Sequence, residues 1–538
     1  MLFFSSLRVV VVNAFNKIYV FIVAFFLLNS ACSFADDKIP SFALENALER
    51  NTFTIDTIGA KHVNVFSEKD FFIESAIKPI IFELRNNITI SSPIHIQGSK
   101  SYCIKGNGFS ISEKVRPKVN CSLAYQARSW YLDRKNKLLK IRLKEPIDIR
   151  QFRNRDSIYV VYEGWFLRFK DRMVSINDSI LTIQCCDKFL SNRKFLTHTP
   201  TPYFYLEERP VDNIEFVQMF SVQKGTKILI DNVNFIGASS CCISNAGMLK
   251  IQNCHFNNMS GGAIKVTGEL YVDKSHFSDI TSYGIQALPR SYLEVTNSVF
   301  KEMGLKGSNY GCIITKGYSY IANNIFIDFN YAAVRLGRRN CSLNVYPSSI
   351  VEGNIMKWTP DWEKKMKVFG LVDGGAIYVS TCNKRTIIRG NTIINFGGHG
   401  SNRAIYCDDG AFNVTIYGNV IKGTRNSYDI DSRDCSRKWE KQKDAPNCPN
   451  TGNYIGYNIC DGKLKLEGAS VVIDNGCVFE YNVIVGRNDD AKDIVNNNYK
   501  KKYAIVYDSH GHIDDRGRVF LKKAKKTIKI KAPFLKQE

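Results

Sequence analysis

The feature that most constrains this chain is a short unit that recurs along residues 228–485. In each copy a run of apolar residues leads into Asn or Gly-Asn, and an apolar residue follows two or three positions later, as in Gly390-Asn-Thr-Ile393. The shortest spacing is 21 residues, as between Phe235 and Phe256. Because helical periodicity is absent and Asn tolerates left-handed backbone angles, the unit predicts one coil of a parallel β-solenoid. The ten copies end at Phe235, Phe256, Phe277, Phe300, Phe326, Met356, Ile393, Ile421, Cys460 and Ile484.

The remaining sequence divides around this repeat. Residues 36–120 contain less regular strand patterns and are expected to form N-terminal coils, while 227–485 form the main solenoid. Between them, residues 121–226 lose the repeat and are rich in aromatic and β-branched residues, which predicts an inserted β-domain. Residues 486–538 are polar and basic, as expected of a cap or tail. The predicted fold class is therefore all-β, a right-handed parallel β-helix with an inserted small β-domain.

The amino terminus carries a pattern typical of export. Residues 18–28 are apolar, and small residues before Ala35 suit signal-peptide cleavage. We therefore expect residues 1–35 to be a signal peptide cleaved near Ala35, and the mature chain to be secreted, periplasmic or on the cell surface. A lipid anchor at Cys32 is the weaker alternative, because Asn29 fits poorly in a lipidation motif. No later stretch is long enough to cross a membrane.

The charge and the cysteine content of the chain indicate which binding partners and cofactors to expect. The chain of 538 residues has a formal net charge of +22, which favours a polyanionic partner. Nucleic acid is not expected, because no recognised nucleic-acid motif accompanies the charge. Fifteen cysteines remain beyond the predicted cleavage site, without zinc-finger spacing, so no metal or cofactor is expected, and some disulfide bridges are plausible outside the cytoplasm.

A second strand in each coil builds an outward face. Side chains alternate along a strand, so residues that point outward from successive coils stack in columns about 4.8 Å apart. These columns change from basic to aromatic to acidic along the solenoid, which suits an elongated glycan, including an acidic one; the alternative is a solvated face of cross-strand pairs. One column reads Ser244, Lys265, Gln286, Ile314, Arg335, Tyr378, Tyr406 and Asp431, and the next Thr267, Leu288, Lys316, Gly337, Ser380, Asp408 and Arg433.

Carboxylates gather at one end of this face. Asp408 and Asp431 lie on adjacent coils and two residues apart along the strand, a diagonal of roughly 8 Å that suits a glycosidase acid and its partner. Asp409 is a further candidate, although Asp409 before Gly410 also fits a turn. Asp373 ranks lower, because by residue count it lies too far from Asp408 for direct partnership. The residues expected to bind substrate are Tyr378, Tyr406, Arg335, Lys265, Lys316, His399 and Arg433.

Three motifs then carry a family resemblance. The Gly-Asn coils, the segment Asp373-Gly-Gly-Ala-Ile-Tyr378 and the segment Ala404-Ile-Tyr-Cys-Asp408-Asp409-Gly410 resemble right-handed parallel β-helix glycoside hydrolases and related pectate-lyase-like proteins. Trp130-Tyr-Leu-Asp-Arg134 is similar to β-helix glycosidases that act on fucosyl or xylosyl linkages. The resemblance implies catalytic aspartates on this face, which map onto Asp373, Asp408 and Asp409. Polygalacturonase-like hydrolases place their Asp-Asp pair before Gly-His-Gly, whereas here Gly398-His399-Gly400 precedes Asp408-Asp409. The catalytic residues of those hydrolases therefore cannot be mapped onto this chain.

Three functions follow from these observations. The leading hypothesis is an exported glycoside hydrolase that cleaves a polysaccharide or glycan with an aspartate acid and an aspartate base or nucleophile. The first alternative is a calcium-assisted polysaccharide lyase or epimerase, with Arg403 or Arg433 as base and Asp408, Asp429 and Asp431 around calcium. The second alternative is a non-catalytic glycan-binding surface protein, since one fold hosts many functions.

Overall fold

A computed structural model provides the structure of the chain. It describes residues 53, 55–71, 78–98, 101–113, 124–133, 135–143, 158–162, 165–177, 180–184, 202–206, 218–238, 241–259, 261–304, 311–337, 348–369, 373–380, 385–397, 402–408, 411, 414–423, 428–432, 453–461, 463–466, 478–480, 482–485, 505–508 and 512–520. The predicted signal peptide, Cys32 and the basic end of the tail lie outside these residues.

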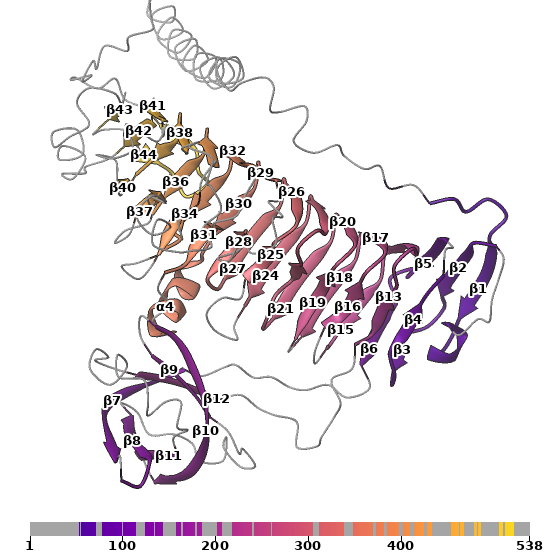
Figure 1. Cartoon of the computed structure of the whole chain (residues 1–538), viewed down its shortest axis with the longest axis horizontal. Coiled ribbons are helices and arrows are strands. Elements are labelled where there is room, and N and C mark those ends of the chain that lie inside the picture. Colours follow the sequence, from indigo (N-terminus) through magenta and orange to yellow (C-terminus); the bar gives the residue numbers. More distant parts are fainter. Residues whose placement is uncertain are drawn as a thin grey trace, which may run out of the picture.

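Three long parallel sheets, here called A, B and C, wind into a solenoid (Figure 1). Each coil of the main solenoid supplies one strand to sheet C, then one to sheet A, then one to sheet B, and every pairing between neighbouring coils is parallel. The predicted right-handed parallel β-helix with an inserted small β-domain is thus confirmed.

The strand bounds show how regular the coils are. Sheet A contains β1 (Lys61–Val65), β2 (Ile80–Leu84), β5 (Ser101–Lys105), β14 (Lys227–Asp231), β17 (Met248–Gln252), β20 (Glu269–Asp273), β23 (Tyr292–Thr296), β26 (Tyr318–Ala322), β29 (Ser348–Glu352), β32 (Arg385–Arg389), β35 (Val414–Tyr417), β38 (Tyr454–Gly456) and β41 (Val478–Glu480). Sheet B contains β3 (Ile88–Ile90), β6 (Ser110–Glu113), β15 (Asn234–Ile236), β18 (His255–Met259), β21 (His276–Ile280), β24 (Val299–Met303), β27 (Ile325–Phe329), β30 (Ile355–Lys357), β33 (Thr392–Ile394), β36 (Val420–Lys422), β39 (Ile459–Cys460), β42 (Asn482–Val485) and β43 (Ile505–Asp508). Sheet C contains β4 (Ile94–Ile96), β13 (Phe220–Val222), β16 (Cys241–Asn245), β19 (Gly262–Val266), β22 (Ile285–Ala287), β25 (Gly311–Thr315), β28 (Ala332–Leu336), β31 (Gly375–Val379), β34 (Arg403–Cys407), β37 (Tyr428–Ser432) and β40 (Lys463–Leu466).

Stacked side chains fill the interior of the solenoid. Five phenylalanines from successive sheet B strands form a column, with neighbouring ring centroids 4.6 to 5.0 Å apart and rings nearly parallel. All five are fully buried. Burying one aromatic side chain removes about 200 Å² of surface from water. The apolar residue that ends each repeat unit therefore supplies the core. The five are Phe235, Phe256, Phe277, Phe300 and Phe326.

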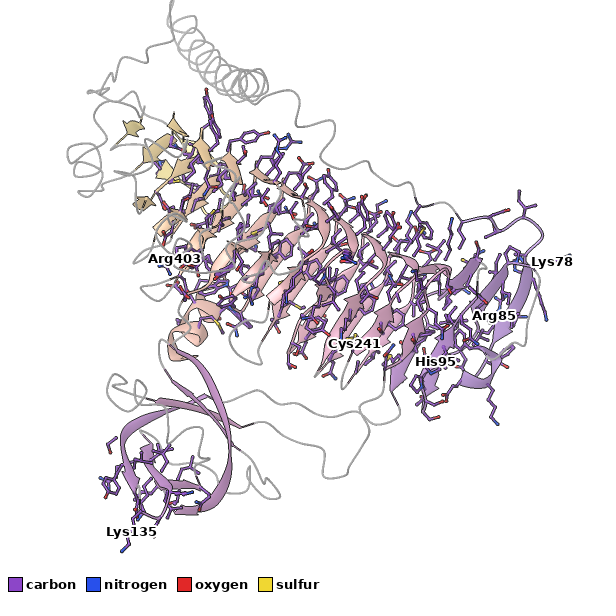
Figure 2. All side chains as sticks on the ribbon, viewed as in Figure 1. Lys78, Arg85, His95, Lys135, Cys241 and Arg403 are labelled. Carbon is purple, nitrogen blue, oxygen red and sulfur yellow. The ribbon has the colours of Figure 1, made fainter. Side chains whose placement is uncertain are left out.

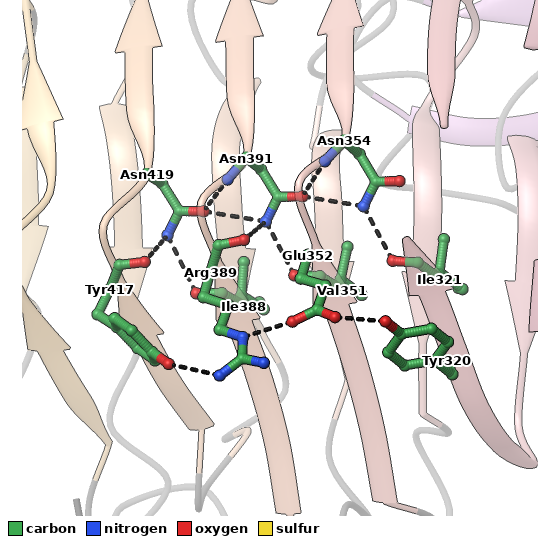
Figure 3. A network of polar contacts seen from close by, with 10 residues as sticks. All are labelled: Tyr320, Ile321, Val351, Glu352, Asn354, Ile388, Arg389, Asn391, Tyr417 and Asn419. Atoms are coloured by element: carbon green, nitrogen blue, oxygen red, sulfur yellow. Dashed lines mark hydrogen bonds and ion pairs between the residues drawn. The ribbon is translucent and has the colours of Figure 1, made fainter. Parts of the chain in front are cut away.

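The bend between sheets A and B is the fixed point of each coil. From β14 to β39 two residues separate the strands, and the first of them has a left-handed backbone, for example Gly390 with φ 60°. The second is a buried Asn in the later coils, and each side-chain amide donates to the next (Figure 3): Asn354 to Asn391 over 2.9 Å and Asn391 to Asn419 over 3.0 Å. The predicted column of Asn354, Asn391, Asn419, Asn458 and Asn482 is confirmed, and Asn324 joins it.

The outer side of sheet A carries a second polar ladder (Figure 3). Glu352 accepts hydrogen bonds of 2.5 Å from both Tyr320 and Arg389, and Arg389 donates to Tyr417 over 2.9 Å. The two tyrosines are buried together with Ile387. These contacts link four consecutive coils, so they stabilise the stack from outside as the amide ladder does from inside.

All lengthened connections of the main solenoid flank sheet C. Helix α4 (Pro360–Phe369) connects β30 to β31, and its first turn is anchored where Thr359 donates to Asp328. Among the described residues, no helix is long and apolar enough to cross a membrane.

The inserted β-domain also connects sheet B to sheet C, between β6 and β13. It is a closed antiparallel barrel in the order β10-β11-β8-β7-β12-β9. Helix α4 contacts β7, and Figure 1 shows the barrel below α4, toward the C-terminal part of the solenoid. The elements outside the three sheets are β7 (Ala124–Asp133), β8 (Leu138–Leu143), β9 (Ile158–Tyr162), β10 (Trp165–Asn177), β11 (Ile180–Gln184), β12 (Pro202–Leu206), the 3-10 helix η2 (Glu68–Phe71), and the hairpin of β44 (His512–Ile513) and β45 (Val519–Phe520).

The structure describes seven cysteines, and all of them are buried. Burial raises the pKa of Cys241 to about 11 and that of Cys254 to about 12. These cysteines therefore act as small core residues. The expected disulfide bridges are absent from this part of the chain, and the pair Cys185-Cys186 lies outside it.

The amide ladder makes a stability prediction. In Asn391→Ala the backbone N–H and the side-chain amide of Asn354 both lose their acceptor in the interior. This loss should lower the free energy of unfolding by about 2–4 kcal/mol. Chemical denaturation of the purified chain measures the difference.

The control for this prediction is Asn257→Ala, at an exposed position on β18. Surface substitutions of this kind cost less than about 0.5 kcal/mol. Equal effects of the two substitutions would show that the ladder does not stabilise the coils.

Candidate functional site

The register of sheet C brings the predicted columns together. Arg335 pairs with Tyr378, Tyr378 with Tyr406, and Tyr406 with Asp431, on the successive strands β28, β31, β34 and β37. At the other end Ser244, Lys265, Gln286 and Ile314 continue the same column. The column predicted from sequence therefore exists as a line of neighbouring residues on one face.

Arg403 is the centre of the acidic end. Its Nε donates to Asp431 Oδ2 over 2.8 Å, and its Nη1 lies 3.3 Å from Asp373 Oδ1. The guanidinium carbon also sits 4.2 Å from the centre of the Tyr406 ring, in a cation–π contact. The Arg403 side chain is 6% exposed and that of Asp431 is 0% exposed. The two therefore form a buried ion pair to which a second, more accessible carboxylate is attached.

Asp408 has a different partner. The Tyr378 hydroxyl donates to Asp408 Oδ2 over 2.7 Å, and Asp408 is 6% exposed. The Tyr378 ring packs between those of Tyr331 and Tyr406, with centroids 5.5 and 5.1 Å away. Burial raises the pKa of the Tyr331 phenol well above its ordinary value, and the charges of Asp373 and Asp408 add to this while Arg335 opposes it. Tyr331 is therefore close to both carboxylates.

Asp373, which the residue count ranked below Asp408, joins this network through Arg403 and Tyr406. Its Oδ1 accepts a hydrogen bond of 3.0 Å from Tyr406, and its left-handed φ of 65° turns the chain into β31. The next two residues must be glycine, because a Cβ on Gly374 would come within 2.7 Å of a backbone oxygen and one on Gly375 within 2.9 Å of the Tyr406 side chain. This sharp turn, which a residue count cannot include, brings Asp373 to Tyr406 and Arg403.

The aromatic residues at this end play a different part from the one expected. Tyr378 and Tyr406 are 3% and 0% exposed, so their ring faces are not available for stacking on sugars. Their hydroxyls instead donate to Asp408 and Asp373. Asp373, with 36% of its side chain exposed, is the most accessible carboxylate of the network.

The basic residues lie farther along the face. Lys265 is exposed on β19, whereas Lys316 and Arg335 are half-buried. The Arg335 guanidinium carbon lies 5.4 Å from the Tyr378 ring centre and 5.6 Å from that of Tyr331. Arg335 therefore links the basic part of the column to the acidic end. Asp409, His399 and Arg433 lie outside the described residues.

The proposed calcium ligands do not gather into one site. Asp429 and Asp431 are fully buried on β37, but Asp431 is engaged by Arg403, and Asp429 lies close enough to Cys460 to help raise the pKa of that buried thiol. Within the described ranges, no group of three or more His, Cys, Asp or Glu side chains is arranged to hold a metal ion.

Sequence reasoning missed two members of the network. The sequence pattern indicates Arg403 only as a base for the lyase alternative, and it does not indicate Tyr331. Arg403 is the first residue of β34 and pairs with Gly375. Because glycine has no side chain, the Arg403 side chain can extend across this position. A basic residue opposite the glycine pair was the signal that could have identified it.

Comparisons with known proteins give only distant similarities. No protein-family model and no curated protein matches the chain. Among solved structures, a protein described as a glycoside hydrolase matches 74% of this chain and 91% of its own, with 10% identity and a TM-score of 0.45. A mannuronic acid specific family 6 polysaccharide lyase from human gut microbiota matches 83% and 82%, with 10% identity and a TM-score of 0.35. A family 28 exopolygalacturonase of Yersinia enterocolitica matches 83% and 75%, with 10% identity and a TM-score of 0.30. Similarities this distant do not assign a function to this chain.

The buried ion pair can be tested by stability. Arg403→Met leaves Asp431 as a buried charge without its cation, which should lower the free energy of unfolding by about 3–5 kcal/mol. The double variant Arg403→Met with Asp431→Asn removes that charge and should regain at least about 1 kcal/mol. Denaturant titration compares the variants.

The control for this test is Arg85→Met, which breaks a more exposed ion pair with Glu83. It should cost at most about 1 kcal/mol. A double variant no more stable than the single Arg403 variant would contradict the buried ion pair.

Proposed function

We propose that this chain is an exported glycoside hydrolase that cleaves an acidic polysaccharide or glycan bound along sheet C. The observation that supports this most is the pair of carboxylates with different partners at the acidic end. Asp373 accepts hydrogen bonds from Arg403 and Tyr406, and Asp408 accepts one from Tyr378. Glycosidases need such unequal carboxyl environments, because one group must carry a proton while the other stays ionised.

The neighbours suggest which carboxyl has which role. The Arg403 cation favours the ionised form of Asp373, which is also the carboxylate that solvent reaches. We assign Asp373 as the nucleophile or as the base that activates water. Asp408, held by the neutral Tyr378 hydroxyl, is then the acid that protonates the leaving oxygen.

Asp431 has a supporting role in this proposal. It is fully buried and its charge is matched by Arg403, so it orients the guanidinium that in turn holds Asp373. Of the two partners that the sequence offers for Asp408, Asp431 or Asp373, we therefore choose Asp373. Asp409, next to Asp408 in sequence, stays a candidate.

Three basic residues of the face, which we call the basic column, are proposed to bind the substrate. Arg335, Lys316 and Lys265 lie on coils that lead away from the carboxylates. Their charges attract carboxyl or sulfate groups of a polymer. A predicted signal peptide at residues 1–35 would deliver the enzyme outside the cytoplasm, where such polymers occur.

Two other functions remain distinguishable by product. A lyase or epimerase that depends on calcium would lose activity with a chelator, and a lyase would release sugars that absorb ultraviolet light. A hydrolase would release reducing ends that do not absorb ultraviolet light, and a chelator would not inhibit it. A glycan-binding protein would release nothing. Incubating the mature chain with acidic, fucosylated and xylosylated polysaccharides separates these outcomes.

The carboxylate assignment predicts large losses of turnover. Asp373→Asn and Asp408→Asn should each lower kcat by about 100-fold or more on a substrate that the wild type cleaves, because a positioned acid or base is lost. Asp409→Asn tests the remaining candidate in the same assay. Asp361→Asn, at an exposed position on α4, is the control and should keep full activity. Full activity of both the Asp373 and Asp408 variants would place the chemistry elsewhere.

The basic column predicts an effect on binding. Lys265→Ala, several coils from the carboxylates, should raise KM for long polymers about 3- to 10-fold with kcat nearly unchanged, because a lost surface charge contact contributes about 1 kcal/mol. Short oligosaccharides that do not reach β19 serve as the internal control and should show no change. An equal rise in KM for short and long substrates would argue against a polymer lying along this face.

A further inference from the structure

One face of the inserted barrel combines an exposed ring with basic side chains. On β7, β8 and β11 side chains alternate between the barrel interior, where Leu139, Ile141 and Leu181 are at most 1% exposed, and the outside. Outside, Tyr131 is 65% exposed and Ile180 is 38% exposed. Tyr131 on β7 and Ile180 on β11 lie on either side of β8. Exposed apolar side chains rimmed by polar residues are typical of a binding surface.

The strand register places these groups together. Tyr131 pairs with Lys140, which pairs with Thr182, and in the adjacent row Ser129 pairs with Arg142, which pairs with Ile180. Residues opposite one another are about 4.5–5.5 Å apart, and diagonal neighbours about 7–8 Å. Tyr131 therefore lies within side-chain reach of both Lys140 and Arg142. We call Ser129, Tyr131, Lys140, Arg142 and Ile180 the barrel patch.

The charge around the barrel patch is positive. The turn between β7 and β8 adds exposed Lys135 and Lys137. The nearby acid Asp133 accepts two hydrogen bonds from Asn136, and these bonds are the main reason why its pKa is lowered. The described residues of β7, β8 and their turn include five bases and this one acid. This face is therefore an attractive surface for an anionic partner.

The barrel patch is separate from the carboxylate site but belongs to the same region of the molecule. Helix α4 contacts β7, and α4 precedes Asp373 in the chain by a few residues. Figure 2 shows Lys135 at the outer end of the barrel, away from the solenoid. A long polymer held at this outer end would be kept near sheet C without occupying it.

From these observations we infer that the barrel patch is a second binding surface for an anionic polysaccharide. Tyr131 packs its ring against a sugar, and Lys140 and Arg142 donate to acidic groups on either side. A polysaccharide fits better than nucleic acid, because the patch offers one ring with bases beside it and not the row of stacking rings that single strands use. This inference rests on and deepens the proposed function, and it names a binding step outside the carboxylate site.

The test measures polymer binding by the full-length protein. The triple variant Tyr131→Ala, Lys140→Ala and Arg142→Ala should bind polygalacturonate at least about 10-fold more weakly than the wild type, since it loses a ring contact and two charge-assisted hydrogen bonds. Affinity electrophoresis or calorimetry gives the change, and neutral dextran should bind neither protein. The variant Lys224→Ala with Lys227→Ala removes two exposed charges from the solenoid and should bind as the wild type does.

The outcome separates this inference from the proposed function. Asp361→Asn, on the exposed face of α4, should bind polygalacturonate as the wild type does. The binding measurement needs no turnover, so failure of catalysis does not affect this test. If the wild type is active, the triple variant should keep its kcat on short oligosaccharides. The inference is overturned if the triple variant binds the polymer as the wild type does, if the Lys224 and Lys227 control loses as much affinity, or if the patch binds single-stranded DNA more tightly than polygalacturonate.

Discussion

The two-residue bend between sheets A and B is the constraint on which the rest of the structure depends. From β14 to β39 its first residue is left-handed, and from Asn324 onward its second residue is a buried Asn whose side-chain amide donates to the next. Because this corner does not vary, the strands of all three sheets stay in register. Added chain length can then appear only beside sheet C, where the barrel and α4 are inserted. Variation is thereby concentrated around one face.

That face carries a charge arrangement that stability alone would not favour. Burying an arginine with a carboxylate costs solvation energy that the ion pair repays only in part, and an apolar pair is often as stable. The solenoid interior shows that apolar stacking is available within the same fold, in the phenylalanine column. The buried pair of Arg403 and Asp431 is better explained by its second contact, because it fixes the guanidinium that holds the accessible Asp373.

Sequence predicted the repeated features of the molecule and missed the local ones. The Asn column follows from the periodicity of the repeat, and so do the pairings of Tyr378 with Tyr406 and of Tyr406 with Asp431. Counting residues is therefore enough to find them. The contact between Asp373 and Tyr406 depends on one left-handed residue and two glycines, which change the direction of the chain without changing the count. Burial of the tyrosines could not be predicted, because alternation tells which side of a sheet a residue faces and not whether that side is covered.

The proposed cleavage of a sugar linkage between Asp373 and Asp408 can be tested by a crystal structure with bound substrate. The full-length Asp408→Asn variant, soaked with an oligosaccharide of the polymer that the wild type cleaves, should trap an uncleaved chain along sheet C. The account predicts the glycosidic oxygen within about 3.2 Å of the residue 408 side chain, the distance needed for proton transfer. Asp373 should approach the neighbouring sugar carbon directly or through one water. A linkage bound away from both residues would contradict the account.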